Sequence, residues 1–422
     1  MKKSMLFAML VPLLGMSIVS CSDKDDSGRN EDEKVQVKFI AKPVIEGTVD
    51  AKMMEGLIAV FTDIRNQDTT HCIIHNPGTG TVALRKGTYN IAVEKSIKTA
   101  QGKDSIVISS RLENVSVNQN GQEINGKLNV TPADALGQNF IFSEIFFNGE
   151  TNSGRMMHPD QYFVVFNPTQ DTLYADGLSV AVTQQVVFQN KQLWYDSYYP
   201  TRVPIGGFVT VPGSGKDHPV APGDKFVVAF TAIDHSKVEG YDHAVDLSGA
   251  DFEIYEGPEA HDVDNPEVPN MLLVDYVTKA SYGFFMHPRG YISPLMFKLP
   301  DGKQTTVDQF VKDNVSESKT EYRATKNTPA EIITVQILSI ATDKIIDGVQ
   351  TSDVPQDVKT RVVPVSVDRG KFLVSGCHRQ ELAIRRQIKV GSRTFYKDTN
   401  NSSDDFVMQK GQNSWPKGWR KR

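Results

Sequence analysis

The sequence is poor in the features that mark zinc-binding, nucleic-acid-binding and polytopic membrane proteins. It has three cysteines in 422 residues, and they form neither a CxxC pair nor a Cys/His spacing suited to zinc. Basic residues number 46 against 51 acidic ones, so the basic excess typical of nucleic-acid binders is missing. The single long apolar run lies at the N-terminus, which excludes a polytopic membrane protein.

Sequence motifs of common catalytic sites are also absent. The chain contains no HExxH, P-loop, GxGxxG or nucleophile-elbow pattern. With 39% hydrophobic and 23% charged residues, the composition is that of an ordinary globular chain long enough for two or three domains. We therefore expect a protein that is not an enzyme and that needs no cofactor.

The N-terminus has the layout of a bacterial lipoprotein signal. Two lysines precede an apolar stretch over residues 5–19, which a proline and a glycine interrupt. Such a stretch fits a signal peptide better than a membrane-spanning helix. It ends in Ser20 and Cys21, and a small residue directly before such a cysteine resembles a lipobox. The resemblance implies that residues 1–20 are removed and that acyl chains on Cys21 hold the protein on a membrane. The alternative is a free cysteine beside an ordinary cleavage site.

An acidic, polar segment follows the cysteine. Residues 22–26 read SDKDD, and residues 21–34 together have the composition of a flexible tether. The acidic start resembles the surface-export signal of Bacteroidota lipoproteins. That resemblance implies a lipid-anchored protein on the outer face of the outer membrane, and it is compatible with a plain solvated tether.

The rest of the chain is predicted to be β throughout. Beyond residue 30 we find no convincing helical periodicity, whereas short runs with strand character recur between turn residues. They lie at 35–40, 56–63, 88–94, 105–110, 115–117, 162–166, 178–182, 185–188, 225–230, 252–255, 332–338, 361–367 and 381–388. This pattern predicts an all-β protein with one β-sandwich over 35–130 and a larger one, with long insertions, over 131–422.

The first predicted sandwich contains a hairpin-like segment, GTVALRKGTYNIAVE at residues 80–94. It resembles the transthyretin-like and carboxypeptidase-regulatory-like modules, which implies a spacer or docking domain. The nearby pair His71 and His75 shares one face of a strand, roughly 13 Å apart, which is too far for one metal ion. Cys72 and Cys377 are expected to stay unpaired because they fall in different predicted domains.

The second predicted sandwich opens with FIFSEIFFNGETN at 140–152 and DQYFVVFNPTQDTLYADGLSVAVT at 160–183. These segments resemble the start of a lamin-tail-like domain, an immunoglobulin-type sandwich. The matching residues are Ser143, Glu144, Ile145, Asn148, Asn167, Pro168, Asp171, Leu173 and Leu178. Residues 163–166 depart from the family, which usually has acidic residues there, and residues 384–406 resemble its closing strand and Asn-rich loop.

Two groups of residues are candidate binding sites. Trp194, Tyr195, Tyr198 and Tyr199 lie in a proposed insertion, where aromatic rings make good ligand platforms; the commoner alternative is a small hydrophobic core under a loop. Asp398, Asn400, Ser402 and Asp404 place oxygen side chains at alternate positions, as in the first half of a calcium loop. Because the usual Gly and Glu are missing further on, an Asx-rich turn fits that segment better.

A further polar cluster is a candidate metal site. It contains His261, Asp262, Asp264 and Asn265, with Asp234, His235, Asp242 and His243 nearby in the sequence. Hard or borderline metals use such ligands, but a solvated, turn-rich loop is the more ordinary use of this composition.

Together with the lipobox, the arrangement resembles an uncharacterised family of Bacteroidota surface lipoproteins found beside TonB-dependent transporters. The resemblance implies an accessory that binds a nutrient or a partner protein. An adhesive or fimbrillin-like structural protein is the alternative, and a surface hydrolase is disfavoured by the missing motifs. Iron, haem, cobalamin, zinc and glycans all stay open as ligands.

Overall fold

The structure is a computed structural model that describes residues 34–44, 49–98, 105–132, 138–147, 160–239, 244, 246–260, 262–276, 284, 286–323, 325, 327–352, 359–374, 381–390 and 393–410. The predicted lipidation site Cys21, the signal and the tether lie outside these residues, as do Cys377, Asn148, Asp242, His243 and His261. Within the described residues, no helix has the length and apolar content needed to span a membrane.

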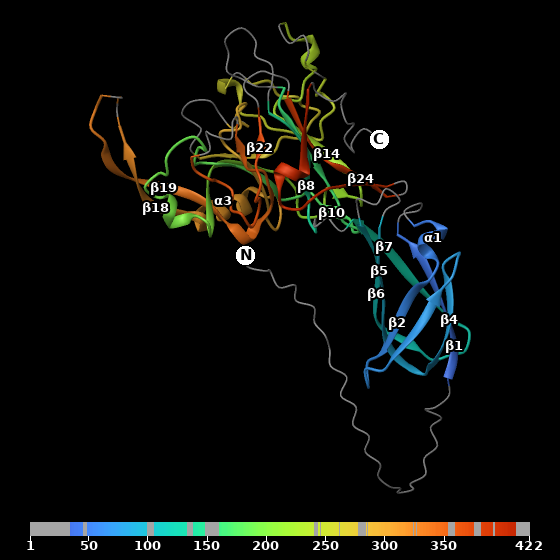
Figure 1. The fold of residues 1–422 in the computed structure, drawn as a ribbon. Coiled ribbons are helices and arrows are strands. Elements are labelled where there is room, and N and C mark those ends of the chain that lie inside the picture. The colour runs from blue at the N-terminus through green and yellow to red at the C-terminus, as the bar shows by residue number, and fades with distance from the viewer. Residues whose placement is uncertain are drawn as a thin grey trace, which may run out of the picture.

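Residues 34–132 form a seven-stranded sheet that curls on itself (Figure 1). Its strands are β1 (Lys34–Pro43), β2 (Leu57–Asp63), β3 (Thr69–Ile74), β4 (Thr79–Arg85), β5 (Gly87–Lys98), β6 (Ser105–Val117) and β7 (Gln122–Pro132), with the short helix α1 (Ala51–Met54) after β1. The order is β3-β2-β5-β6-β7-β1-β4, and β1 and β7 run parallel. Buried and exposed residues alternate along β1, as expected when one face of a sheet covers a core.

Two further sheets pack face to face and form a larger sandwich. One has the order β18-β19-β12-β11-β17-β20, with β16 also paired to β12, and the other has the order β15-β14-β9-β8-β23-β26. The first sheet comprises β11 (Leu178–Thr183), β12 (Arg202–Thr210), β16 (Leu272–Asp275), β17 (Pro294–Lys298), β18 (Val315–Tyr322), β19 (Glu331–Ala341) and β20 (Ile345–Gly348). The second comprises β8 (Ile141–Phe146), β9 (Tyr162–Phe166), β14 (Lys225–Ala229), β15 (Phe252–Glu253), β23 (Glu381–Arg385) and β26 (Phe406–Lys410). Apolar residues of both sheets share one core, so the predicted all-β, sandwich-like fold class is confirmed.

The remaining elements are short and connect or flank these sheets. They are β10 (Leu173–Tyr174) paired with β13 (Pro219–Val220), β21 (Thr351–Ser352) paired with β22 (Phe372–Leu373), β24 (Gln387–Val390) paired with β25 (Arg393–Tyr396), and the helices α2 (Tyr195–Tyr198), α3 (Gln304–Asn314) and α4 (Ser402–Asp405). Among the 3₁₀ turns of the described residues, η4 (Thr342–Lys344) connects β19 to β20.

The expectation of no helix was wrong at α3. This 11-residue helix carries Val307, Phe310 and Val311 at the i, i+3, i+4 spacing of an amphipathic helix. Val307 is fully buried. The ring centroid of Phe310 lies 5.5 Å from that of Phe208 and 5.1 Å from that of Phe297. Only three apolar residues in one stretch of polar sequence signalled this helix.

Two predicted strands, 185–188 and 361–367, are loops. Their backbone groups form hydrogen bonds with side chains and loop residues and not with a neighbouring strand. The amides of Val362 and Val363 both donate to the side-chain oxygen of the buried Gln350, and the carbonyl of Val187 accepts from Lys359 and Thr360. The apolar content of these segments alone predicted strands. In the structure, a buried side chain and neighbouring loops provide the hydrogen-bond partners of their backbone groups.

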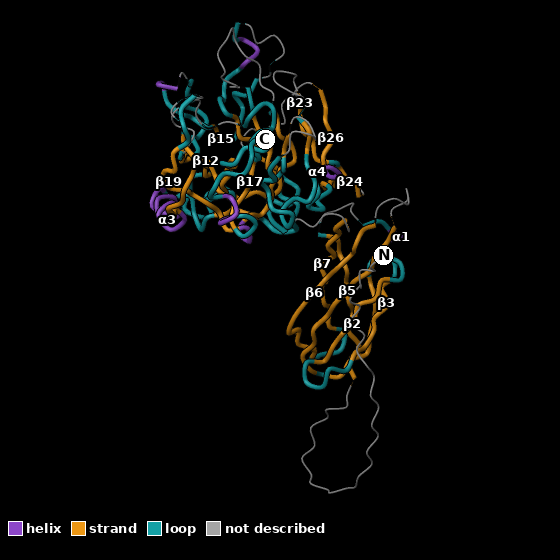
Figure 2. Tube along the Cα trace, turned by 60° about the vertical axis from the view of Figure 1, so that its left-hand side comes forward, coloured by secondary structure: helices purple, strands orange, loops and turns teal. Residues whose placement is uncertain are grey.

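A hairpin from the larger sandwich reaches the N-terminal sheet. Ile388 on β24 and Phe395 on β25 belong to the same buried cluster as the core of residues 34–132. Tyr396 packs on the other side against Phe166, with ring centroids 4.6 Å apart. Figure 2 shows β24 where the two parts of the chain meet. We call β24–β25 the clasp, because its side chains pack into both parts.

A second hairpin, β18–β19, extends away from the sandwich (Figure 1). We call it the arm. β18 ends its sheet, so one of its edges has no partner strand among the described residues, and Tyr322 and Ile332 near the end of the arm are 51% and 57% exposed.

The clasp predicts a strong stability effect at Phe395. Replacing Phe395, which is fully buried, by alanine should lower the free energy of unfolding by about 3–5 kcal/mol through lost burial and a cavity. Urea unfolding followed by fluorescence and circular dichroism measures this loss. The matched control Tyr322→Ala, on the exposed arm, should cost less than about 1 kcal/mol. Equal effects of the two changes would contradict a packed clasp.

Candidate binding pocket

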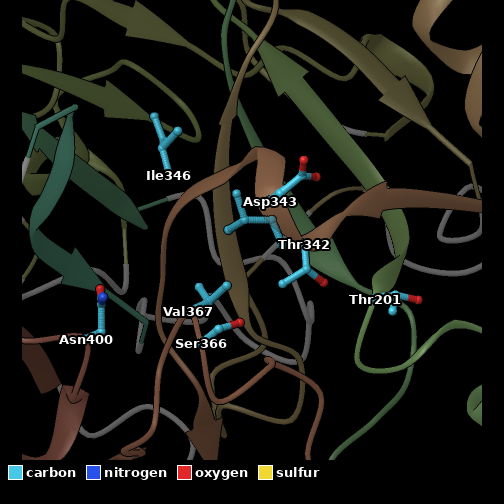
Figure 3. A pocket seen from close by; sticks show the side chains of 8 residues that line it. Thr201, Thr342, Asp343, Ile346, Ser366, Val367 and Asn400 are labelled. Atoms are coloured by element: carbon cyan, nitrogen blue, oxygen red, sulfur yellow. The ribbon is translucent and has the colours of Figure 1, made fainter.

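The larger sandwich has an open surface pocket of about 560 Å³. Thr201, Thr342, Asp343, Ile345, Ile346, Ser366, Val367 and Asn400 line it. Figure 3 shows the side chains arranged from Thr201 at one end to Asn400 at the other. The start of β12, the η4 turn, the start of β20, the loop before β22 and the turn after β25 therefore meet at this pocket. The sequence alone does not reveal this pocket, because nearly 200 residues separate Thr201 from Asn400 in the chain.

Two threonine hydroxyls of the pocket already donate hydrogen bonds to backbone carbonyls of the protein. Thr201 Oγ1 donates to the carbonyl of Tyr198 at 3.0 Å, and Thr342 Oγ1 donates to the carbonyl of Pro200 at 2.6 Å. A hydroxyl has one hydrogen and two lone pairs. Each threonine oxygen can therefore still accept a hydrogen bond, but it has no hydrogen left to give.

The other polar groups stand on the exposed rim. Asp343, Ser366 and Asn400 are exposed, whereas Ile345 and Ile346 are half-buried and Val367 is buried. Asn400 has a φ of 52°, a left-handed conformation that asparagine tolerates better than most residues. The pocket thus combines an apolar wall with a polar rim.

The predicted role of the aromatic residues as an exposed ligand platform is wrong, because their rings are buried. Trp194, Tyr195 and Tyr198 are only 3%, 4% and 7% exposed and cluster with Ile337 of β19, while Tyr199 packs half-buried beside them. The four residues do come together, but their faces are turned into the protein. The sequence left a small core under a loop as the alternative, and the rings occupy such a core beneath the arm.

This aromatic cluster also supports the pocket. The Tyr198 hydroxyl lies 2.8 Å from Ser316 Oγ on β18, and the Tyr195 hydroxyl donates to the carbonyl of Arg361 at 2.5 Å. Burial raises the pKa of Tyr195 well above its ordinary value, so this hydroxyl stays protonated and keeps donating. The Tyr198 carbonyl also accepts the hydrogen bond of the Thr201 hydroxyl. The helix α2 therefore positions both Thr201 in the pocket and the base of the arm at Ser316.

A buried arginine organises the opposite side. Arg385 Nη2 donates to both carboxylate oxygens of Asp347 at 3.0 and 2.8 Å, and its Nη1 lies 2.9 Å from Asp398 and 3.9 Å from Asp405. Its Nε donates to the carbonyl of Phe142 at 2.7 Å. The arginine and the three carboxyl groups are all at least nine-tenths buried. Burial raises the pKa of Asp347 and of Asp405 against the attraction of the guanidinium.

The four predicted calcium ligands lie beside this network. They are Asp398, Asn400, Ser402 and Asp404. The carboxylate of Asp398 binds Arg385, and that of Asp404 accepts from Nδ2 of the Asn401 side chain at 2.6 Å. The backbone N–H of Ser402 donates to the Asp368 carboxylate at 2.8 Å. The segment makes the local hydrogen bonds of an Asx-rich turn. Among the residues described, no three His, Cys, Asp or Glu side chains are grouped to hold a metal ion.

Arg385 should be essential to stability. Replacing Arg385 by leucine leaves three buried carboxyl groups without their cation and should lower the free energy of unfolding by about 3–5 kcal/mol. The neighbouring Arg386 is a matched control, because its side chain is exposed and donates to the Asp404 carbonyl at 2.8 Å. Arg386→Leu should cost less than about 1 kcal/mol in the same urea titration. A loss for Arg385→Leu no greater than that of the control would contradict this role.

The polar cluster around Asp262, the other candidate metal site, is held by local hydrogen bonds. Asp262 accepts from Thr231 Oγ1 at 2.8 Å and from the Glu256 amide at 3.0 Å. Glu253 accepts from the amides of Ala232 and Asn265 at 3.0 and 2.8 Å. In this neighbourhood, burial raises the pKa of Glu253 and that of Glu256 to about 7 each. Of the other candidates, Asp234 caps its own turn by accepting from Ser236, and His235 is fully buried.

The raised pKa of Glu253 predicts a pH dependence. The folded protein holds this proton up to about pH 7, whereas the unfolded chain releases it near pH 4.5. The contribution of Glu253 to stability is therefore complete below pH 4.5 and is lost as the pH rises toward 7. Glu253→Gln imitates the protonated acid. The variant should lose less stability than the wild type between pH 5 and pH 7.5, by roughly 1–3 kcal/mol. Urea unfolding at both pH values tests this, with the exposed Glu259→Gln as a control that should follow the wild type.

The histidine pair and Cys72 lie on or next to β3. His71 is exposed on β3, and His75 pairs with Glu55 at 2.8 Å. Cys72 is buried and free, and burial raises the pKa of its thiol. No metal or redox site follows from these residues.

These features define a mostly β protein with a curled N-terminal sheet, a larger sandwich and a surface pocket. The sequence model of the family described as "Protein of unknown function (DUF4876)" matches residues 221–413. A crystal structure of a DUF4876 family protein from Bacteroides thetaiotaomicron VPI-5482 is similar, with a TM-score of 0.55 and 17% sequence identity. The similarity covers 91% of this chain and 99% of that one.

At that identity the likeness shows the fold alone. A crystal structure of a DUF3823 family protein from Parabacteroides merdae ATCC 43184 shares 11% identity over 36% of this chain and 66% of that one, with a TM-score of 0.17, which is too low to indicate a shared fold. No curated protein matches the chain. The predicted similarity to Bacteroidota proteins of uncharacterised function is thus supported by the domain match and the shared fold. The lipid anchor and the transthyretin-like and lamin-tail-like assignments stay predictions.

Proposed function

We propose that this protein is a surface lipoprotein of the outer membrane that binds a nutrient or a partner protein. Its anchor is Cys21 at the end of the lipobox-like stretch. In this proposal it works as an accessory to a TonB-dependent transporter. The observation that carries the binding role is the open pocket, where polar side chains and an apolar wall face solvent together.

The arm favours a second candidate, an adhesive or fimbrillin-like structural protein. β18 offers eight residues of strand at the end of its sheet, and exposed Tyr322 and Ile332 lie near the end of the hairpin. A sheet edge of this kind can accept a strand from another chain. Glu317, Lys319 and Glu321 along β18 are exposed charges of the sort that protect an edge from pairing, so we rank this candidate second.

Purification from the native membrane separates the two candidates. We expect the lipidated protein, captured from outer membranes, to bring down a transporter β-barrel that mass spectrometry identifies. Cys21→Ala should remove the protein from the outer-membrane fraction, because no acyl chain holds it there. A ladder of the protein itself would favour the structural candidate, and a membrane-bound Cys21→Ala variant would contradict the anchor.

A further inference from the structure

We propose that the pocket binds a neutral, hydroxyl-rich ligand, namely a sugar unit of a glycan. The inference rests on the proposed binding function and names the ligand class of the same pocket. It is carried by the hydrogen-bonding balance of the lining residues, by their charge and by the apolar wall.

The pocket has more hydrogen-bond acceptors than donors. Thr201 and Thr342 give their hydrogens to the Tyr198 and Pro200 carbonyls, and Asp343 is a carboxylate that only accepts. A matching ligand must therefore supply several hydrogens. Sugar hydroxyls do so, and each one also offers an oxygen that Asn400 or Ser366 can bind.

The charge of the lining excludes an anion. Among the described residues that line the pocket, Asp343 is the sole charged side chain, and none of them is a lysine, an arginine or a histidine. A phosphate, a carboxylate or a haem propionate would meet a like charge and find no cation. An ammonium-bearing ligand would satisfy the acceptors, but it would leave the donor groups of Asn400 and Ser366 without the oxygen that a hydroxyl brings.

The wall and the size also fit a sugar. Ile345, Ile346 and Val367 give an apolar surface against which the C–H face of a pyranose ring can pack. The volume of about 560 Å³ lies within the range of small-molecule sites, roughly 300–1,000 Å³. The open shape leaves room for the chain of a longer glycan to continue into solvent.

The pocket is also held in place before any ligand arrives. The Asn400 carbonyl accepts from the Arg369 amide at 2.9 Å, and the Val367 amide donates to Pro364 at 2.9 Å. The aromatic cluster holds Thr201, while Asp398, two residues before Asn400, is bound to Arg385. Such pre-organisation lowers the entropy that binding costs.

The test uses the full chain in a zwitterionic detergent without a sugar headgroup. Isothermal titration and ligand-observed NMR would measure binding of maltose, cellobiose, lactose and mannobiose, with digalacturonic acid as the anionic probe and spermidine as the cationic probe. We expect at least one neutral disaccharide to bind at least tenfold more tightly than either charged probe.

Three variants locate the binding. Asp343→Ala, Ser366→Ala and Asn400→Gly remove the exposed polar groups, and glycine keeps the left-handed backbone of Asn400. Each should weaken binding of that disaccharide at least fivefold, and Asp343→Asn should weaken it less than Asp343→Ala does. Asp171→Ala, an exposed carboxyl outside the lining, is the matched control and should leave binding unchanged. All these sites are exposed, and thermal unfolding checks that each variant is folded.

Binding of no neutral sugar would overturn the inference, as would sugar binding that all three variants leave intact. Tighter binding of spermidine, lost completely in Asp343→Asn, would assign the pocket to a cation. The proposed function fails separately: sugar binding without a co-purifying transporter overturns the accessory role, whereas a transporter without sugar binding overturns the ligand class.

Discussion

The larger sandwich depends on the guanidinium of Arg385. It lies on β23 of one sheet, binds the carboxylate of Asp347 on β20 of the other and also holds Asp398 and Asp405 of the closing turn. Transfer of such charges out of water costs several kcal/mol per ion, so the group persists only because the partners are arranged together. One side chain thereby fixes the distance between two sheets and the position of the turn that carries Asn400.

The pocket results from two rigid supports that come from distant parts of the chain. On one side, Tyr195 and Tyr198 are buried under the arm and use their hydroxyls to tie together β18 and the loop at Arg361. On the other side, the Arg385 network and Asp368 hold the turn before α4. The exposed rim residues add little to the fold, so they can serve recognition at small cost in stability.

The clasp joins this sandwich to the N-terminal sheet. Phe395 fills the core of the first part, while Tyr396 beside it packs on Phe166 of the second. Adjacent strand residues point to opposite faces, so two consecutive residues are enough to connect two cores.

The sequence by itself determined the β class, because strand runs and turn residues are local signals that depend on period-2 alternation. It also marked the aromatic segment at Trp194 and the Asx-rich turn at Asp398 as unusual. Only the tertiary structure decided what these segments do: it buries the rings under β19, gives Asp398 to Arg385 and assembles a pocket from Thr201 to Asn400. Burial, ion pairing and pocket formation join residues far apart in the chain, and no local pattern records which distant segments will meet.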